Sequence, residues 1–250
     1  MRFFNLEKDN IFLYVSILFD ASLSDIFCSF YSGSTLFIND SVKKNPNKMA
    51  AYFNAQRISY ADLPPSILKL LSPKMFVSLK TIVVGGEAAD IGTLRRFADI
   101  FRVINVYGPT EASICTSMER CSPGRTKPTI GNPLSNVNYY VVDESLREVT
   151  KPDEVGELLI GGKCLATGYV NKPELTYNRF VEWRGERYFR SGALVRVLDN
   201  GELEFVGRKD RQIKHRGNLI CLEEIEAALK RLPEIYDAKV IYEEKKLYCF

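Results

Sequence analysis

Histidine is nearly absent from this sequence of 250 residues, because His215 is the only one. This shortage excludes a histidine-rich zinc site, and it excludes Ser-His-Asp or Cys-His catalysis unless that one residue serves. The sequence also lacks an uninterrupted apolar run of about 20 residues, the length that a membrane-spanning helix needs. We therefore expect no membrane partner, and we expect the chemistry to rest on other side chains.

Paired cysteines are missing as well. None of the six cysteines forms a Cys-x-x-Cys pair, and no basic, apolar and small-residue signal sequence begins the chain. This pattern favours a reducing, cytoplasmic setting. The cysteines are Cys28, Cys115, Cys121, Cys164, Cys221 and Cys249.

A strong excess of one charge is also absent, since 34 Lys and Arg face 31 Asp and Glu. The basic residues are spread along the chain, so the electrostatic signature of a nucleic-acid-binding protein is missing. The fractions of 46% hydrophobic and 26% charged residues are those of an ordinary globular protein. At about 100 to 200 residues per domain, the length suits one large or two ordinary domains.

The first half of the sequence predicts alternating strands and helices. An apolar run at 11–18 ends at Phe19 and Asp20, and residues 22–27 then predict a helix start with capping serines and an acidic first turn. Further helices are expected at 47–56, 63–71 and 91–99, and strands at 81–84 and 103–106. This alternation predicts a parallel α/β sheet over residues 1–125, with ligands at the carboxyl ends of its strands.

The second half has a different texture. Short alternating runs at 138–142, 157–160 and 203–206 are separated by Asp, Gly and Pro turns, which predicts antiparallel β structure over 126–208. A helix at 222–232 and a strand at 238–242 then predict the start of a small α/β lobe. We therefore expect an α/β protein with a change of organisation near residue 209.

The segment 107–111, Tyr-Gly-Pro-Thr-Glu, follows the apolar strand expected at 101–106. Tyr107 can offer a flat face to a purine, Thr110 a hydroxyl group, and Glu111 the hard oxygen ligand that Mg²⁺ prefers. A plain surface turn is the alternative, because Gly-Pro after a strand is common.

Six blocks in a fixed order resemble the adenylate-forming (AMP-binding) enzymes, and within them the amino-acid adenylation domains of nonribosomal peptide synthetases. The blocks are Phe-Asp-Ala-Ser at 19–22, Val-Gly-Gly-Glu-Ala at 84–88, 107–111, 156–169, Arg-Ser-Gly at 190–192 and Gly-Arg-Lys-Asp-Arg-Gln at 207–212. The resemblance implies a partial adenylate-forming fold: a parallel-sheet lobe, a β-rich barrel-like lobe and the start of a small C-terminal α/β lobe. The large lobe would span 1–208 and the small one 209–250.

The family joins a carboxylate to ATP, giving an acyl-adenylate and pyrophosphate, and passes the acyl group to a thiol. The resemblance implies an amino-acid substrate and, in an intact parent protein, the phosphopantetheine thiol of a carrier protein. It makes Thr110 and Glu111 the catalytic pair that holds phosphate and Mg²⁺, and Asp210 the hinge between lobes. The residues implied to hold ATP are Gly85, Gly86, Glu87, Tyr107, Gly108 and Arg208.

Asp20 would pair with the α-ammonium group of an amino acid, although it can instead cap the helix that follows. An acyl or aryl coenzyme A ligase would not need this carboxylate. Asp62 could meet a cationic substrate side chain, or cap the next helix. The positions matching the family's side-chain pocket are Ala21, Ser24, Asp62, Val83, Gly85, Val106, Ile114 and Cys115, most of which also suit plain core lining.

The sequence departs from the family at three places. No phosphate loop precedes Phe19, and 32–35 predicts only a helix-to-strand turn. Ala193 stands where the family places a ribose-binding aspartate, and the C-terminal lysine is missing, since Lys245 and Lys246 lie on an expected solvated hairpin. We therefore expect a fragment truncated at both ends, impaired or inactive alone, with a noncatalytic binding module as the competing interpretation.

Overall fold

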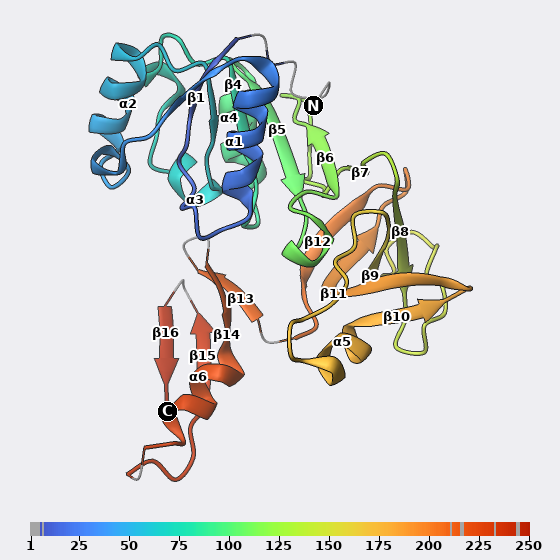
Figure 1. Ribbon diagram of the computed structural model, residues 1–250. Helices are drawn as coiled ribbons and strands as arrows, with labels where there is room; N and C mark the ends of the chain where they lie inside the picture. The colour runs from blue at the N-terminus through green and yellow to red at the C-terminus, as the bar shows by residue number, and fades with distance from the viewer. Residues whose placement is uncertain (1–5, 7, 211, 216–217, 233, 244–245) are drawn as a thin grey trace.

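The computed structural model describes residues 6, 8–210, 212–215, 218–232, 234–243 and 246–250 (Figure 1). Arg211 and Lys245, which belong to segments singled out in the sequence, lie outside the described residues. No helix among the described residues is long and apolar enough to cross a membrane.

A seven-stranded sheet organises the first part of the chain, with strand order β2-β1-β3-β4-β5-β6-β7. The first five strands are parallel, as the sequence predicts, and the last two are antiparallel. The strands are β1 (Asn10–Phe12), β2 (Thr35–Phe37), β3 (Tyr60–Asp62), β4 (Thr81–Val84), β5 (Arg102–Tyr107), β6 (Ser117–Arg120) and β7 (Asn132–Pro133). The helices are α1 (Ala21–Ser32), α2 (Pro46–Ala55), α3 (Pro65–Leu68) and α4 (Ile91–Ala98), with 3-10 turns η1 (Asp40–Val42), η2 (Pro73–Met75) and η3 (Thr110–Ala112).

The two faces of this sheet pack against different helices, because successive side chains of a strand point to opposite faces. Phe12, Ala61, Ile82 and Val103 join a large apolar core with side chains of α2, α3 and α4. The alternate residues Ile11, Tyr60, Val83 and Ile104 pack instead with Cys28 of α1. Helix α1 therefore covers one face alone.

Two local predictions have clear outcomes. The helix expected at 63–71 is shorter, because Leu70 and Leu71 donate to residues three positions back, at 3.0 and 3.2 Å, and so tighten the chain out of the α-helix. The helix-to-strand turn expected at 32–35 is confirmed: Gly33 ends α1 with φ of 63°, and β2 begins at Thr35. This left-handed conformation favours glycine.

A curled antiparallel sheet follows, which we call the half-barrel. Its strand order is β10-β11-β9-β8, and β12 also pairs with β11. The sheet shifts register around Gly192, whose φ is 70°, so the long strand β11 bends there. The elements are β8 (Val137–Val142), β9 (Val155–Gly162), α5 (Pro173–Arg179), β10 (Phe180–Trp183), β11 (Glu186–Val197) and β12 (Leu203–Arg208).

The C-terminal part contains two hairpins and one helix. The hairpins are β13 (Gln212–His215) with β14 (Asn218–Cys221), and β15 (Val240–Glu243) with β16 (Lys246–Cys249). Between them lies α6 (Leu222–Leu229), slightly shorter than the helix expected at 222–232. Lys246 is exposed opposite Glu243, as the expected solvated hairpin requires. The hinge at Asp210 stays a prediction.

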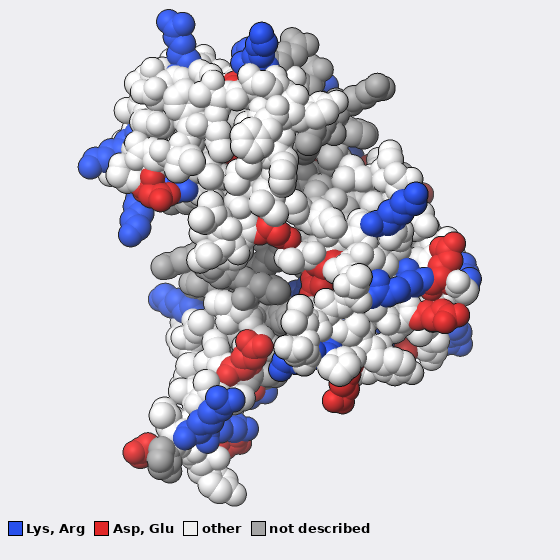
Figure 2. Space-filling model, viewed as in Figure 1, with Lys and Arg blue, Asp and Glu red and all other residues white. Residues whose placement is uncertain are grey.

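The outer face of α1 is apolar and exposed. Leu23, Phe27, Phe30 and Tyr31, spaced so that they share one helix face, are 42%, 55%, 76% and 74% exposed. Figure 2 shows a largely uncharged surface where this helix faces the viewer. Contiguous exposed apolar patches favour association.

Replacing both Phe27 and Phe30 with glutamine should therefore reduce self-association of the chain, measured by static light scattering across a concentration series. Because neither side chain is buried, the free energy of unfolding should change by no more than about 0.5 kcal/mol per site. Tyr236→Gln, at a fully exposed position far along the chain, is the matched control and should leave association unchanged. A wild-type chain that stays monomeric throughout would contradict this prediction.

Candidate functional site

The carboxyl end of β5 meets the half-barrel at Tyr107 (Figure 1). The Tyr107 ring packs against the half-barrel's apolar core, and its hydroxyl group lies near Ser191 of β11. Burial raises the pKa of Tyr107 to about 12, against the opposing effects of Ser191 and the Arg208 charge. The side chain therefore stays a neutral phenol at the junction of the two sheets.

The turn after Tyr107 is tightly constrained. A side chain on Gly108 would place its Cβ 2.3 Å from the Ile114 carbonyl oxygen, so only glycine fits. The chain doubles back, and Thr116 N donates to Tyr107 O at 2.9 Å. Ser113 and Ile114 both have left-handed backbones, with φ of 59° and 74°. For a β-branched residue such as Ile114 this conformation is strained, and such strain gathers at functional sites.

Glu111 is tied to the half-barrel. The Tyr169 hydroxyl donates to Oε1 of Glu111 at 2.5 Å, and Ala166 N donates to the Glu111 carbonyl oxygen at 2.8 Å. Burial and the neighbouring Glu111 carboxylate raise the pKa of Tyr169, so this phenol remains a hydrogen-bond donor. The predicted pair of Thr110 and Glu111 is thus held as one unit in η3.

A carboxylate and a hydroxyl group are hard oxygen donors of the kind that fits Mg²⁺. Within the part of the chain that the structure describes, no group of three or more His, Cys, Asp or Glu residues could hold a metal ion. Magnesium sites often take only one or two carboxylates and complete their ligands with substrate phosphates and water. Thr110 and Glu111 therefore fit a cation that arrives with a phosphate, not a preformed protein cage.

Arg208, which the resemblance implies for ATP binding, is paired with a carboxylate of the chain itself. It donates to the two oxygens of Asp210, at 2.7 and 2.9 Å. Arg179 of α5 donates to the same carboxylate at 2.8 Å. Burial opposes ionisation of Asp210, but the two guanidinium groups outweigh it and hold the pKa of that carboxyl below its usual value. The predicted hinge residue is thus clamped between two arginines.

The glycine block after β4 packs closely against β5 and contacts α3 through its acid. Gly85 fits closely, since an added Cβ would lie 2.6 Å from Cγ2 of Val106, and Gly86 has φ of 79°. Glu87 turns away to α3: its carboxylate accepts from the backbone N and the hydroxyl group of Ser66, both at 3.1 Å. Glu87 therefore anchors a helix start in this structure.

Ala193, at the position of the expected ribose-binding aspartate, is fully buried in the half-barrel core. Its backbone N donates to the Ser191 hydroxyl oxygen at 3.1 Å. The site therefore offers no carboxylate there.

At the start of α1, the Asp20 side chain does not cap the helix. Asp20 stands at the N-terminus of α1, yet its side chain makes no capping hydrogen bond, and its Oδ2 atom is buried without a partner among the described residues. The helix-cap interpretation of Asp20 is therefore wrong. The same holds for Asp62, because Pro64 occupies the N-cap position of α3 and no side chain caps it.

Several predicted pocket residues share the α1 side of the sheet. Asp62 ends β3 two residues after Tyr60, so its side chain points to the same face as Tyr60, toward α1. Val83 lies on this face too, and Val106 packs against the same cluster. Cys115 is close by, because burial and then the Asp62 charge raise its pKa to about 12. Of the remaining predicted positions, Ala21 and Ser24 are half-buried on α1, and Ile114 is half-buried in the loop after η3.

One acidic residue was missed. The sequence suggests Asp25 as a first-turn acid of α1, but it is fully buried and contributes no such first-turn charge. Asp25 lies three residues before Cys28, on the helix face that packs on the sheet. A charged residue at a core-facing helical position was the signal that could have identified it.

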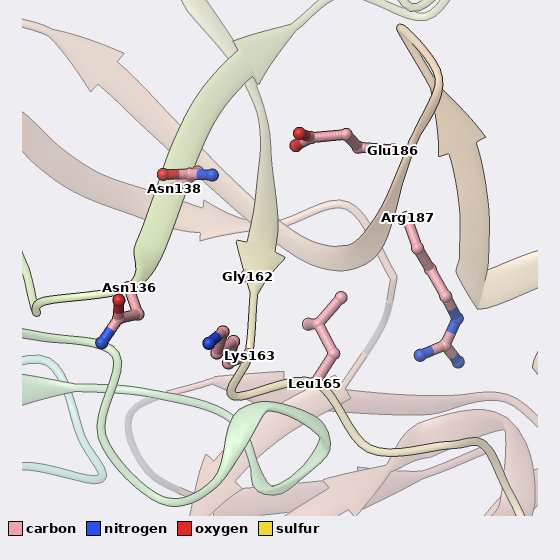
Figure 3. Close-up of a pocket in the computed structure, with 7 residues that line it drawn as sticks. All are labelled: Asn136, Asn138, Gly162, Lys163, Leu165, Glu186 and Arg187. Atoms are coloured by element: carbon pink, nitrogen blue, oxygen red, sulfur yellow. The ribbon is translucent and has the colours of Figure 1, made fainter.

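One hollow lies elsewhere, beside β8, β9 and β11 (Figure 3). Its lining includes the polar side chains of Asn138, Lys163 and Glu186. None of the residues predicted to hold ATP or an amino acid lines it.

Comparison with known proteins matches the AMP-binding enzyme family over residues 1–170, more than half of the chain. Bacitracin synthase 3 of Bacillus licheniformis is 39% identical over 91% of this chain, and tyrocidine synthase 1 of Brevibacillus parabrevis is 37% identical over 95%. The chain spans 4% and 22% of the length of these two relatives.

Solved structures show the same fold. The Vibrio cholerae adenylation domain AlmE, in complex with glycyl-adenosine-5'-phosphate, has a TM-score of 0.87 at 27% identity, over 97% of this chain and 48% of that one. PA1221, an NRPS protein containing adenylation and PCP domains, has a TM-score of 0.86 at 26% identity, over 97% of this chain and 52% of that one. The chain therefore belongs to the AMP-binding enzyme family, as a segment related to the adenylation domains of nonribosomal peptide synthetases.

Proposed function

We propose that this chain contributes to ATP-dependent activation of an amino acid, giving an aminoacyl-adenylate and pyrophosphate. The observation that carries the proposal is the Asp20 carboxylate, which has a buried oxygen without a partner among the described residues at the start of α1. Helix α1 follows the parallel strand β1, so Asp20 belongs to the same carboxyl edge of the sheet as the Tyr107–Glu111 turn. An α-ammonium group would supply the missing partner.

In the proposed reaction an oxygen of the amino-acid carboxylate forms a bond to the α-phosphorus of ATP, and pyrophosphate leaves. Asp20 would hold the α-ammonium group and so orient the carboxylate. The Tyr107 ring would lie against the adenine, and Thr110 with Glu111 would face the phosphates. Mg²⁺, when bound there, would neutralise charge on the phosphate oxygens.

Two relatives support this assignment. The AlmE structure holds glycyl-adenosine-5'-phosphate, which is an aminoacyl-adenylate. PA1221 joins an adenylation domain to a PCP domain, which supports a carrier-protein thiol as the acceptor of the activated amino acid. We further propose that Asp210 is the hinge between residues 1–208 and 209–250. Its bonds to Arg208 and Arg179 would then have to break when the lobes rotate.

A noncatalytic binding module is the second candidate, and two observations favour it. Ala193 cannot accept hydrogen bonds from ribose hydroxyl groups, and Arg208 is already paired with Asp210. Both features weaken the nucleotide side of the site while leaving the Asp20 side intact.

Replacing Asp20 with alanine tests the amino-acid assignment. Loss of a charge-assisted hydrogen bond of about 1.5 to 3 kcal/mol should lower amino-acid-dependent exchange of pyrophosphate into ATP roughly ten- to a hundredfold. Exchange is measured on the protein as its native reading frame encodes it. Asp99→Asn, at an exposed carboxylate, is the control and should retain full exchange. A coenzyme A ligase of simple carboxylic acids would barely notice the Asp20 change, and that outcome would contradict the proposal.

Calorimetric titration of the 250-residue chain with ATP and Mg²⁺ separates a competent nucleotide site from a weakened one. Because Ala193 removes a charged acceptor, we expect binding roughly ten- to a hundredfold weaker than an aspartate at this position would allow. Micromolar affinity would show that the loss is compensated. It would then favour the catalytic candidate over the noncatalytic module.

A further inference from the structure

The Tyr169 phenol occupies one oxygen of the carboxylate that the proposed function assigns to a cation. Its hydroxyl group donates to Oε1 of Glu111 at 2.5 Å, which is short even for a hydrogen bond to an ionised oxygen. Among the described residues, no other group donates a hydrogen bond to this carboxylate. Tyr169 therefore caps Oε1 and leaves Oε2 as the free oxygen of the half-buried Glu111 side chain.

The segment around the start of α5 holds Tyr169 in place. Its backbone N donates to the Thr176 hydroxyl oxygen at 2.9 Å, and that hydroxyl group donates to the Lys172 carbonyl oxygen, also at 2.9 Å. Gly168 has φ of 152°, and a Cβ added to it would lie 2.5 Å from Cγ2 of Thr176. The Tyr169 ring meets the Phe180 ring edge-on, with the ring centroids 5.9 Å apart. The phenol is thus positioned by hydrogen bonds and by packing.

The backbone that carries Glu111 is fixed by separate contacts. Ala166 N donates to the Glu111 carbonyl oxygen at 2.8 Å, and the Ser113 hydroxyl group donates to the Cys164 carbonyl oxygen at 2.7 Å. Ala112, between them, is fully buried in the half-barrel core. Because both ends of the side chain are held, Glu111 cannot turn both of its oxygens toward one ligand without breaking the bond to Tyr169.

One oxygen and two oxygens suit different cations. Mg²⁺ demands near-ideal octahedral geometry at about 2.0 to 2.1 Å, and it usually takes one or two carboxylates together with phosphates and water. Ca²⁺ takes about six to eight oxygen ligands in a flexible geometry, and a carboxylate can bind it through both oxygens. Capping Oε1 removes the two-oxygen mode that is available to Ca²⁺, and it leaves the one-oxygen mode that suits Mg²⁺.

We propose that Tyr169 is a positioning residue that makes Glu111 a one-oxygen ligand and thereby selects Mg²⁺ over Ca²⁺ as the cation that accompanies the nucleotide. This inference rests on the proposed function, because it takes Glu111 as the ligand of a cation that arrives with a phosphate. Tyr169 acts through Glu111, and Thr176 acts through Tyr169.

The test measures cation preference by binding, without turnover. Calorimetry with α,β-methylene-ATP, on the protein as its native reading frame encodes it, would compare saturating Mg²⁺ with saturating Ca²⁺. The wild type should bind the nucleotide at least about tenfold more tightly with Mg²⁺, and Tyr169→Phe should reduce that ratio at least about fivefold. Tyr177→Phe, at an exposed tyrosine of α5, is the matched control and should leave the ratio unchanged.

The ratio separates positioning from a structural role. Phenylalanine at 169 keeps the ring that packs on Phe180, so loss of general stability would weaken binding with both cations equally. An unchanged ratio in Tyr169→Phe, or a wild type that binds equally well with either cation, would overturn this inference alone. Full cation-dependent binding by Glu111→Gln, or no nucleotide binding with either cation, would overturn the proposed function and this inference with it.

Thr176 gives an independent check, because it lies farther from the cation than Tyr169. Thr176→Val removes the hydroxyl group that holds the Tyr169 backbone, and it should lower the Mg²⁺ to Ca²⁺ ratio in the same direction as Tyr169→Phe. Thr176→Ser keeps that hydroxyl group and should restore the wild-type ratio. A serine variant as impaired as the valine variant would show that packing alone is at work, and it would contradict the role given to Thr176.

Discussion

Parallel pairing of β1, β3, β4 and β5 is the constraint on which the candidate site depends. It brings the carboxyl ends of these strands to one edge, and the alternation of side chains then divides their residues between two faces. The face toward α2, α3 and α4 is apolar throughout its core. The face toward α1 ends in Asp62, Gly85 and Val106, so a shift of one residue in any strand would move its contribution into the opposite core.

Helix α1 places two carboxylates beside the sheet at a cost to stability. Its inner face places Asp25 in an apolar setting, and its N-terminus holds Asp20 without the capping bond that an aspartate there usually makes. A helix selected only for folding would have an apolar residue in place of Asp25, and the side chain of Asp20 would cap its N-terminus. Asp25 departs from the apolar pattern of a buried helix face, and Asp20 from the usual helix cap, on the same side of the sheet. Such departures from the preferences of folding indicate function.

The sequence was sufficient where the apolar pattern is regular. Strands β4, β5, β8, β9 and β12 follow from periodicity, and the six blocks identify the family; the long strand β11 was not predicted. The short strand β3 was not predicted, because three residues are too few to show a period. Asp25 was missed for a different reason: its burial depends on which face of α1 packs inward, and only the folded sheet defines that face.

Arg208 makes contacts within the chain that its motif does not reveal. A guanidinium group satisfies whichever acceptors lie within reach, and here these are Asp210, Gln212 and the Ser191 carbonyl oxygen. A phosphate that approached Tyr107 would have to compete with a bidentate carboxylate, a contact among the strongest that arginine makes. Arg179 holds the same carboxylate, so Asp210 would keep one ion pair if Arg208 turned to a nucleotide. Under the proposed function, this remaining pair would lower the cost of releasing Arg208, and nucleotide binding would loosen the contacts of Asp210.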